Sequence, residues 1–158
     1  MAEYTKPVIF HLGNEEYGVD ITAVSSIEQY QQVIPVPNAQ SYILGLTNLR
    51  GQIIPVYSLR RKFNMPDFTG NSSDRKLIIV RIKDTLMALD VDEVSDIQEF
   101  SISNVTAVPF IVKTDNIKYF DRVARIGDRI VMLIDVEYLL TDEELMEAQK
   151  MAEQFSNK

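Results

Sequence analysis

The stretch YILGLTNLRGQIIPVYSL, residues 42–59, is the most apolar part of the chain, and Arg50 is its only charged side chain. Two apolar segments, Tyr42–Leu49 and Gln52–Tyr57, flank the pair Arg50-Gly51. Glycine tolerates the positive φ that a tight turn needs. The stretch therefore predicts a β-hairpin with Arg50 at or beside its tip.

Two residues of this hairpin carry further expectations. Pro55 lies in the second segment and has no backbone N–H, so its strand is expected to be an edge strand or to be bulged there. Arg50 has two interpretations. It is either an exposed turn residue that keeps an apolar hairpin soluble or a recognition residue, because one fixed cation beside an apolar surface is typical of an interface.

These residues also carry a family resemblance. The run Asn48-Leu49-Arg50-Gly51, followed by Ile53-Ile54-Pro55-Val56, resembles the signature of the CheW family, the adaptors of bacterial chemotaxis. The resemblance extends over essentially the whole chain. Its other elements are Val8-Ile9-Phe10, Glu16–Ile21, Val36-Pro37, Tyr42-Ile43, Gly45 and Ile130–Leu140.

Composition limits the class of protein. A chain of 158 residues with 46% apolar residues can form one compact domain or two small intertwined ones. It has no cysteine, which excludes disulfides and fits a cytosolic compartment, and no long apolar run that would enter a membrane. The net charge of −7 argues against nucleic acid as a partner. Arg60-Arg61-Lys62 is interpreted as a solvated turn of helix.

Most of the chain has the alternating pattern of β-strands. Strands are expected at Val8–Leu12, Glu16–Ile21, Leu77–Ile82, Thr85–Val91 and Arg129–Val136, and one helical turn at Leu59–Phe63. Asn64–Asp74 is the clearest linker, and Pro109–Tyr119 is expected to hold a longer loop. A helix is predicted over Thr141–Phe155, where Thr141 and Glu144 have the spacing of a capping box. Its apolar stripe is expected to pack on the strands.

The chain also contains an internal repeat. The run Asp20–Ile27 matches Asp90–Ile97 at its Asp, aliphatic, Val-Ser and Ile positions, and Gly51–Val56 similarly matches Gly127–Leu133. The repeat suggests two similar small β units in tandem. It also predicts that Val24 and Val94 occupy equivalent places.

The resemblance implies a specific fold and specific partners. The fold is all-β, with two tandem five-stranded SH3-like barrels, a groove between them and a C-terminal α-helix. The expected limits are 14–65 and 74–140 for the barrels, with terminal segments crossing between them, and 141–155 for the helix. The groove would hold the cytoplasmic tip of a chemoreceptor, a methyl-accepting chemotaxis protein. Its expected residues are Val8, Ile21, Val24, Ile27, Asn48, Arg50 and Val94.

A second surface, near Gly45 and Leu46, would meet the regulatory domain of the histidine kinase CheA. The resemblance thus implies a cytoplasmic adaptor that reaches membrane-associated receptor arrays through its partners. Many family members carry an acidic residue that pairs with the motif arginine, but here that position holds Ser26. The partner of Arg50 is therefore Glu28, a receptor carboxylate or water.

Other functions are less favoured by the residues. An adaptor of the same family serving a motility or development kinase is the alternative within binding proteins. A chain with one histidine and no cysteine offers no metal cage or catalytic constellation, so neither an enzyme nor a cofactor is expected. Asp90, Asp92 and Glu93 lack the spacing of a calcium loop and are interpreted as solvated hairpin acids.

Overall fold

The computed structural model describes residues 4–37, 39, 42–70, 72–97, 100–101, 105–107 and 120–156. The loop expected at Pro109–Tyr119 lies outside these residues. Short strands that contain many β-branched residues form two larger sheets and a two-stranded pair, β1 (Tyr4–Thr5) with β10 (Phe100–Ser101). Within the described residues, no helix is long and apolar enough to cross a membrane.

The first sheet has five strands in the order β4-β7-β8-β6-β5. Only the β6–β8 pairing is parallel. The strands are β4 (Val24–Gln29), β5 (Ile43–Leu49), β6 (Gln52–Ser58), β7 (Lys76–Ile82) and β8 (Thr85–Val91).

The second sheet has six strands in the order β11-β12-β13-β3-β2-β9, and only the β13–β3 pairing is parallel. Its strands are β2 (Pro7–Leu12), β3 (Glu15–Asp20), β9 (Glu93–Ile97), β11 (Val105–Ala107), β12 (Phe120–Ile126) and β13 (Arg129–Ile134). Without β11, this is the strand order of the first sheet.

The register confirms that the two halves of the chain are equivalent. Val24 pairs with Val80 in the first sheet, and Val94 pairs with Phe10 in the second. Each residue lies 70 positions from its counterpart, and both ladders shift register at the same place, next to these valines. The predicted fold of two five-stranded β units with a C-terminal helix is therefore confirmed.

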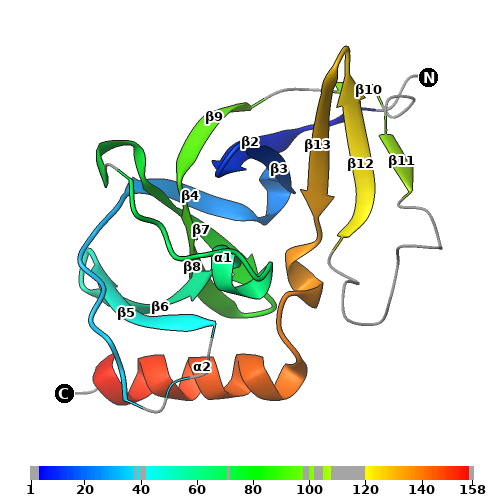
Figure 1. Cartoon of the computed structure of the whole chain (residues 1–158). Coiled ribbons are helices and arrows are strands. Elements are labelled where there is room, and N and C mark those ends of the chain that lie inside the picture. The colour runs from blue at the N-terminus through cyan, green and yellow to red at the C-terminus, as the bar shows by residue number, and fades with distance from the viewer. Residues whose placement is uncertain are drawn as a thin grey trace.

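The sheets nevertheless divide the chain differently from the expected limits of 14–65 and 74–140. The β2–β3 hairpin lies in the second sheet, but the strand that follows it, β4, pairs with β7 in the first. Likewise β9 leaves the β7–β8 hairpin and pairs with β2 (Figure 1). The units exchange one strand each, because an edge strand satisfies its backbone groups equally well on either sheet.

The described residues form three apolar clusters. One lies within the first sheet and includes Ile54, Val56 and Ile79, and a smaller one within the second includes Ile9, Val131 and Leu133. The largest cluster draws on both sheets and on α2 (Asp142–Ser156). Its members include Phe10, Tyr57 and Leu145. The two units thus share a common core.

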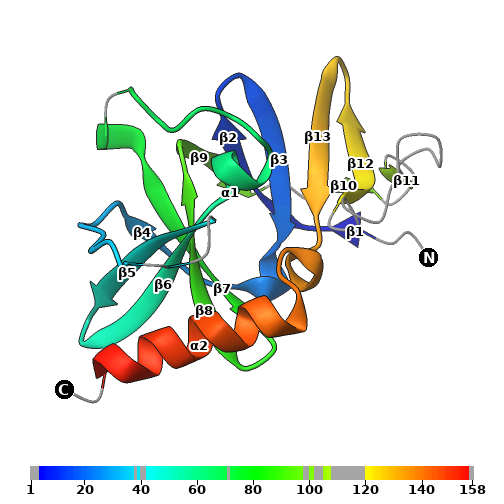
Figure 2. The ribbon, with the colours of Figure 1, turned by 60° about the horizontal axis from the view of Figure 1, so that its bottom comes forward.

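Short helices complete the frame. In the described part of the chain they are η1 (Ile21–Ala23), α1 (Leu59–Lys62), η2 (Ser72–Asp74) and η6 (Val136–Tyr138). The predicted capping box of α2 is present: Glu144 N–H donates to Thr141 Oγ1 at 3.1 Å, and Thr141 N–H donates to Glu144 Oε1 at 2.8 Å. As predicted, α2 packs on the strands, where it lies along β6 (Figure 2).

β6 lies between β5 and β8, so Pro55 is not on an edge strand, and the irregularity in the β5–β6 ladder falls on β5, between Ile43 and Gly45, rather than at Pro55. The ladder with β8 begins only at Val56, so the missing N–H of Pro55 interrupts no ladder bond on that side. This local gap in pairing is what admits a proline to an internal strand.

Candidate functional site

The hairpin tip holds Arg50 in a fixed backbone conformation. Leu49 pairs with Gln52, so the turn consists of Arg50 and Gly51 alone, with φ of 53° and 90°. Positive φ at both positions is the geometry of a type I′ turn, which matches the twist of the strands. Asn48 Oδ1 accepts a hydrogen bond from Gly51 N–H at 2.8 Å. The Asn-Leu-Arg-Gly motif is thus a turn that its own asparagine closes.

Glu28 is the partner of Arg50. Arg50 Nη2 lies 2.8 Å from both Glu28 Oε1 and Oε2. The Glu28 side chain is 12% exposed, whereas that of Arg50 is 73% exposed. The carboxylate therefore anchors one end of the guanidinium and leaves most of it facing solvent. Ser26 stands where many family members have an acidic residue, and Glu28, two positions further along β4, supplies the carboxylate instead.

The same ion pair closes the first sheet. Glu28 lies on β4 and Arg50 follows β5, and these two strands form opposite edges of the sheet. A contact between their side chains requires the sheet to curl round on itself. This accounts for an apolar interior in a sheet of only five strands.

An irregularity in β4 decides which of its side chains share a face. Val24 pairs with Val80 and Ile27 with Ile78, and both partners belong to the shared core. The register shifts between Val24 and Ser26, so Val24 and Ile27 lie on one face although they are three residues apart. The other face carries Glu28, toward the interior of the first sheet.

The predicted groove residues are not equally accessible. Ile21, Val24 and Val94 are partly exposed and pack against the shared core, and Ile27 is 37% exposed. Asn48 and Arg50 are exposed. Val8 differs, because its side chain is fully buried in the shared core and offers no surface to a partner. Val24 and Val94 thus lie against one common core rather than in two separate ones.

Gly45 and Leu46, the residues expected to face the kinase, are both buried. The segment that precedes β5 covers them. Ile34 and Leu46 form an isolated antiparallel bridge, with Ile34 N–H donating to Leu46 C=O at 2.8 Å and Leu46 N–H to Ile34 C=O at 2.9 Å. Ile34 is 58% exposed. The accessible surface at this place therefore belongs to Ile34 and its neighbours.

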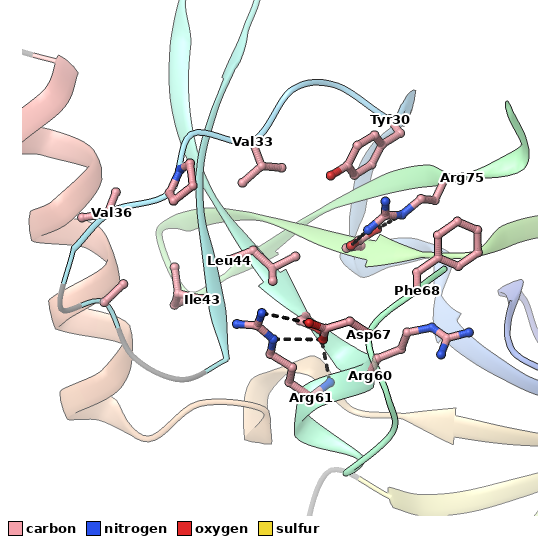
Figure 3. Close-up of a pocket in the computed structure, with 14 residues that line it drawn as sticks. Tyr30, Val33, Val36, Ile43, Leu44, Arg60, Arg61, Asp67, Phe68 and Arg75 are labelled. Atoms are coloured by element: carbon pink, nitrogen blue, oxygen red, sulfur yellow. Dashed lines mark hydrogen bonds and ion pairs between the residues drawn. The ribbon is translucent and has the colours of Figure 1, made fainter. Parts of the chain in front are cut away.

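A cavity of about 600 Å³ lies between the segment that precedes β5, with the first residues of β5, and the segment from α1 to Phe68 (Figure 3). Val33, Ile43 and Leu44 are among the aliphatic residues that line it. Its arginines are paired within the chain, Arg60 with Asp92, Arg61 with Asp67 and Arg75 with Asp90. Arg75 also lies over the rings of Tyr30 and Phe68, 4.0 and 4.7 Å from their centroids. These contacts brace the linker against β7 and β8.

The structure corrects two interpretations of charged residues. Asp90 and Asp92 are not solvated acids, because their side chains are 9% and 13% exposed; only Glu93 is exposed. Burial raises the pKa of Asp90 above its ordinary value although Arg75 bonds to it. Burial also opposes the charge of Asp92, but hydrogen bonds from Arg60 and from Gly13 N–H leave its pKa lowered.

Arg60 likewise is not part of a solvated turn, since its side chain is 17% exposed. Sequence reasoning missed these buried pairs because charge alone does not reveal burial. The one feature of the sequence that singled out Asp90 was the repeat, in which Asp90 corresponds to Asp20 near the end of the equivalent strand.

Comparison with known proteins gives one consistent family. Residues 6–144 match the model of the CheW-like domain. The chain is 36% identical to the chemotaxis protein CheW of Klebsiella aerogenes, over 87% of this chain and 82% of that protein. It is 32% identical to the CheW of Treponema pallidum, over 92% and 85%.

A solved structure gives the same answer. The scaffolding protein TtCheW from Thermoanaerobacter tengcongensis superposes with a TM-score of 0.79 at 28% identity, covering 90% of this chain and 91% of that one. The family model, the relatives and the fold agree over nearly the whole sequence. The chain belongs to the CheW family, the adaptors of bacterial chemotaxis.

Proposed function

We propose that this chain is a non-catalytic adaptor that couples chemoreceptors to the histidine kinase CheA. Its relatives in Klebsiella aerogenes and Treponema pallidum are chemotaxis proteins, and TtCheW is described as a scaffolding protein. The observation that carries the proposal is the surface at the hairpin tip. There Arg50, mostly exposed and anchored on Glu28, follows a β-turn in the family motif.

The receptor surface proposed here consists of Ile21, Val24, Ile27 and Val94, with Arg50 and Asn48 at its rim. The aliphatic members are accessible in part, and the β4 irregularity turns Val24 and Ile27 to the same side. An apolar strip with a single cation beside it suits an amphipathic helix that carries a carboxylate. The cytoplasmic tip of a methyl-accepting chemotaxis protein is the partner that the family resemblance implies.

The kinase surface proposed here lies over Gly45 and Leu46. Because both residues are buried, the atoms that meet the CheA regulatory domain would be those of the covering segment around Ile34. Gly45 and Leu46 would then act by holding that segment in place. The chain itself would be cytoplasmic and would reach receptor arrays through these partners.

A pull-down with both partners tests the proposal. The purified chain is mixed with a soluble receptor tip and the CheA regulatory domain from the same organism, each separately and then together. We expect the chain to retain each partner alone and to carry both in one complex, because the aliphatic receptor residues lie on η1, β4 and β9, whereas the proposed kinase surface lies over β5. Retention of neither partner, by a chain with a normal cooperative melting curve, would overturn the proposal.

A further inference from the structure

The chain passes from the first sheet to the second at a single residue. Asp92 is the only residue between β8 and β9. Its side chain accepts hydrogen bonds from Arg60 Nε at 2.9 Å and from Arg60 Nη2, and also from Gly13 N–H at 2.7 Å. Its own N–H donates to His11 C=O at 3.1 Å. One carboxylate thus joins α1, which follows β6 of the first sheet, to the β2–β3 turn of the second sheet.

Arg60 extends this connection into the linker. Its Nη1 donates to Pro66 C=O at 2.8 Å, and its guanidinium lies 5.6 Å from the centroid of the Phe68 ring. The side chains of Arg60 and Asp92 are 17% and 13% exposed, so water screens the pair only weakly. The ion pair therefore connects three segments that are far apart in sequence: the β2–β3 turn at Gly13, α1 with the linker, and the β8–β9 crossing at Asp92.

At the other crossing, from β3 to β4, the residues that correspond to Arg60 and Asp92 differ in chemistry. In the internal repeat, Thr22 corresponds to Asp92, and Glu137, 77 positions after Arg60, corresponds to Arg60. The parallel ladders β6–β8 and β13–β3 have the same register under this correspondence. The N–H and the hydroxyl of Thr22 both donate to Asp20 Oδ1, two residues away in the same segment. A threonine and a glutamate at these positions cannot form an ion pair.

We propose that Arg60 and Asp92 are positioning residues whose ion pair sets the angle between the two units at one crossing. Val94 lies two residues beyond Asp92 on β9, and Val24 lies on β4 at the other crossing. The angle between the units therefore fixes how these two valines are placed relative to each other. This inference rests on the proposed receptor surface, because that placement decides whether a rigid helical partner touches both sides.

Distances between spin labels test the angle directly. The chain contains no cysteine, so cysteines introduced at exposed Met146 on α2 and exposed Asp128 in the β12–β13 turn are its only labelling sites. We expect Arg60→Gln and Asp92→Asn to shift or broaden the distance distribution. Arg60→Gln is the milder change, because Asp92 keeps its bond to Gly13 and the variant should fold if Asp92→Asn does not.

Asp90→Asn is the matched control. It breaks a pair of similar burial, Arg75–Asp90, which lies within the first sheet and should leave the angle unchanged. We expect Arg60→Gln to bind the receptor tip about tenfold more weakly than wild type, in the usual range of coupling between distant groups. Asp90→Asn should bind within about twofold of wild type at a similar loss of melting temperature.

Each outcome decides between the two claims. A label distance and receptor affinity in Arg60→Gln that match those of Asp90→Asn would overturn the positioning role. A wild-type chain that fails to bind the receptor tip would instead overturn the proposed function, and the label distances would still decide whether the ion pair sets the angle.

Discussion

Gly45→Ala is expected to lower the free energy of unfolding by more than about 2 kcal/mol, a loss typical of strained and overpacked sites. Gly45 has a φ of 153°, a conformation that residues with a Cβ rarely adopt. A Cβ added there would lie 2.1 Å from Ile34 O and 2.9 Å from Pro35 Cα, both of them backbone atoms. The covering segment would have to move, and its bridge to Leu46 would break. Urea unfolding at pH 7 measures the loss.

Gly51→Ala is the control for this prediction. Gly51 also has a positive φ, 90°, but nothing lies within 4 Å of the Cβ position. The Gly51→Ala substitution should lower the free energy of unfolding by about 1 kcal/mol, because only the backbone conformation disfavours alanine there. Equal losses in the two variants would contradict a role for close backbone contact at Gly45. If the prediction holds, weak kinase binding by a Gly45 variant would report displacement of the Ile34 segment rather than a lost contact.

Arg50→Glu is expected to weaken binding to the receptor tip by at least about tenfold, within the range measured for charged groups at interfaces. The substitution places a second carboxylate beside Glu28, which is 12% exposed, and repels an acidic partner. The free energy of unfolding should fall by about 1–3 kcal/mol, because the mostly buried Glu28 carboxylate loses its cation, but the strand ladders should keep the variant folded. Titration calorimetry with the receptor tip and urea unfolding measure the two quantities.

Arg125→Glu controls for net charge. Arg125 is an exposed arginine on β12 of the second sheet, and its replacement changes the charge of the chain by the same amount. Its receptor affinity should stay close to that of wild type. Equal weakening by both variants would show that long-range charge, rather than the hairpin tip, controls binding.

Local elements of this fold could be predicted from the sequence because local patterns specify them. The hairpin of residues 42–59 follows from its Gly51 turn, and the C-terminal helix from the capping box at Thr141. The repeat correctly made Val24 and Val94 equivalent, since strand register repeats with the sequence.

Long-range pairing could not be predicted in the same way. The exchange of β4 and β9 between sheets depends on which edge is free, and no local pattern encodes that choice. The partner of Arg50 remained open because it depends on how far the first sheet curls. Val8 had the same aliphatic character as Val24, but a position between two neighbouring strands buries it.

The receptor is proposed to meet the strip of β4 and β9 beside Arg50. Site-specific photo-crosslinking tests it most directly, with a crosslinking amino acid placed either at Ile27 on β4 or at Ile130 on β13. Both side chains are exposed, 37% and 59%, so accessibility does not favour Ile27. A crosslink to the receptor tip is expected from position 27 and none from position 130. A crosslink from position 130 with none from position 27 would contradict it.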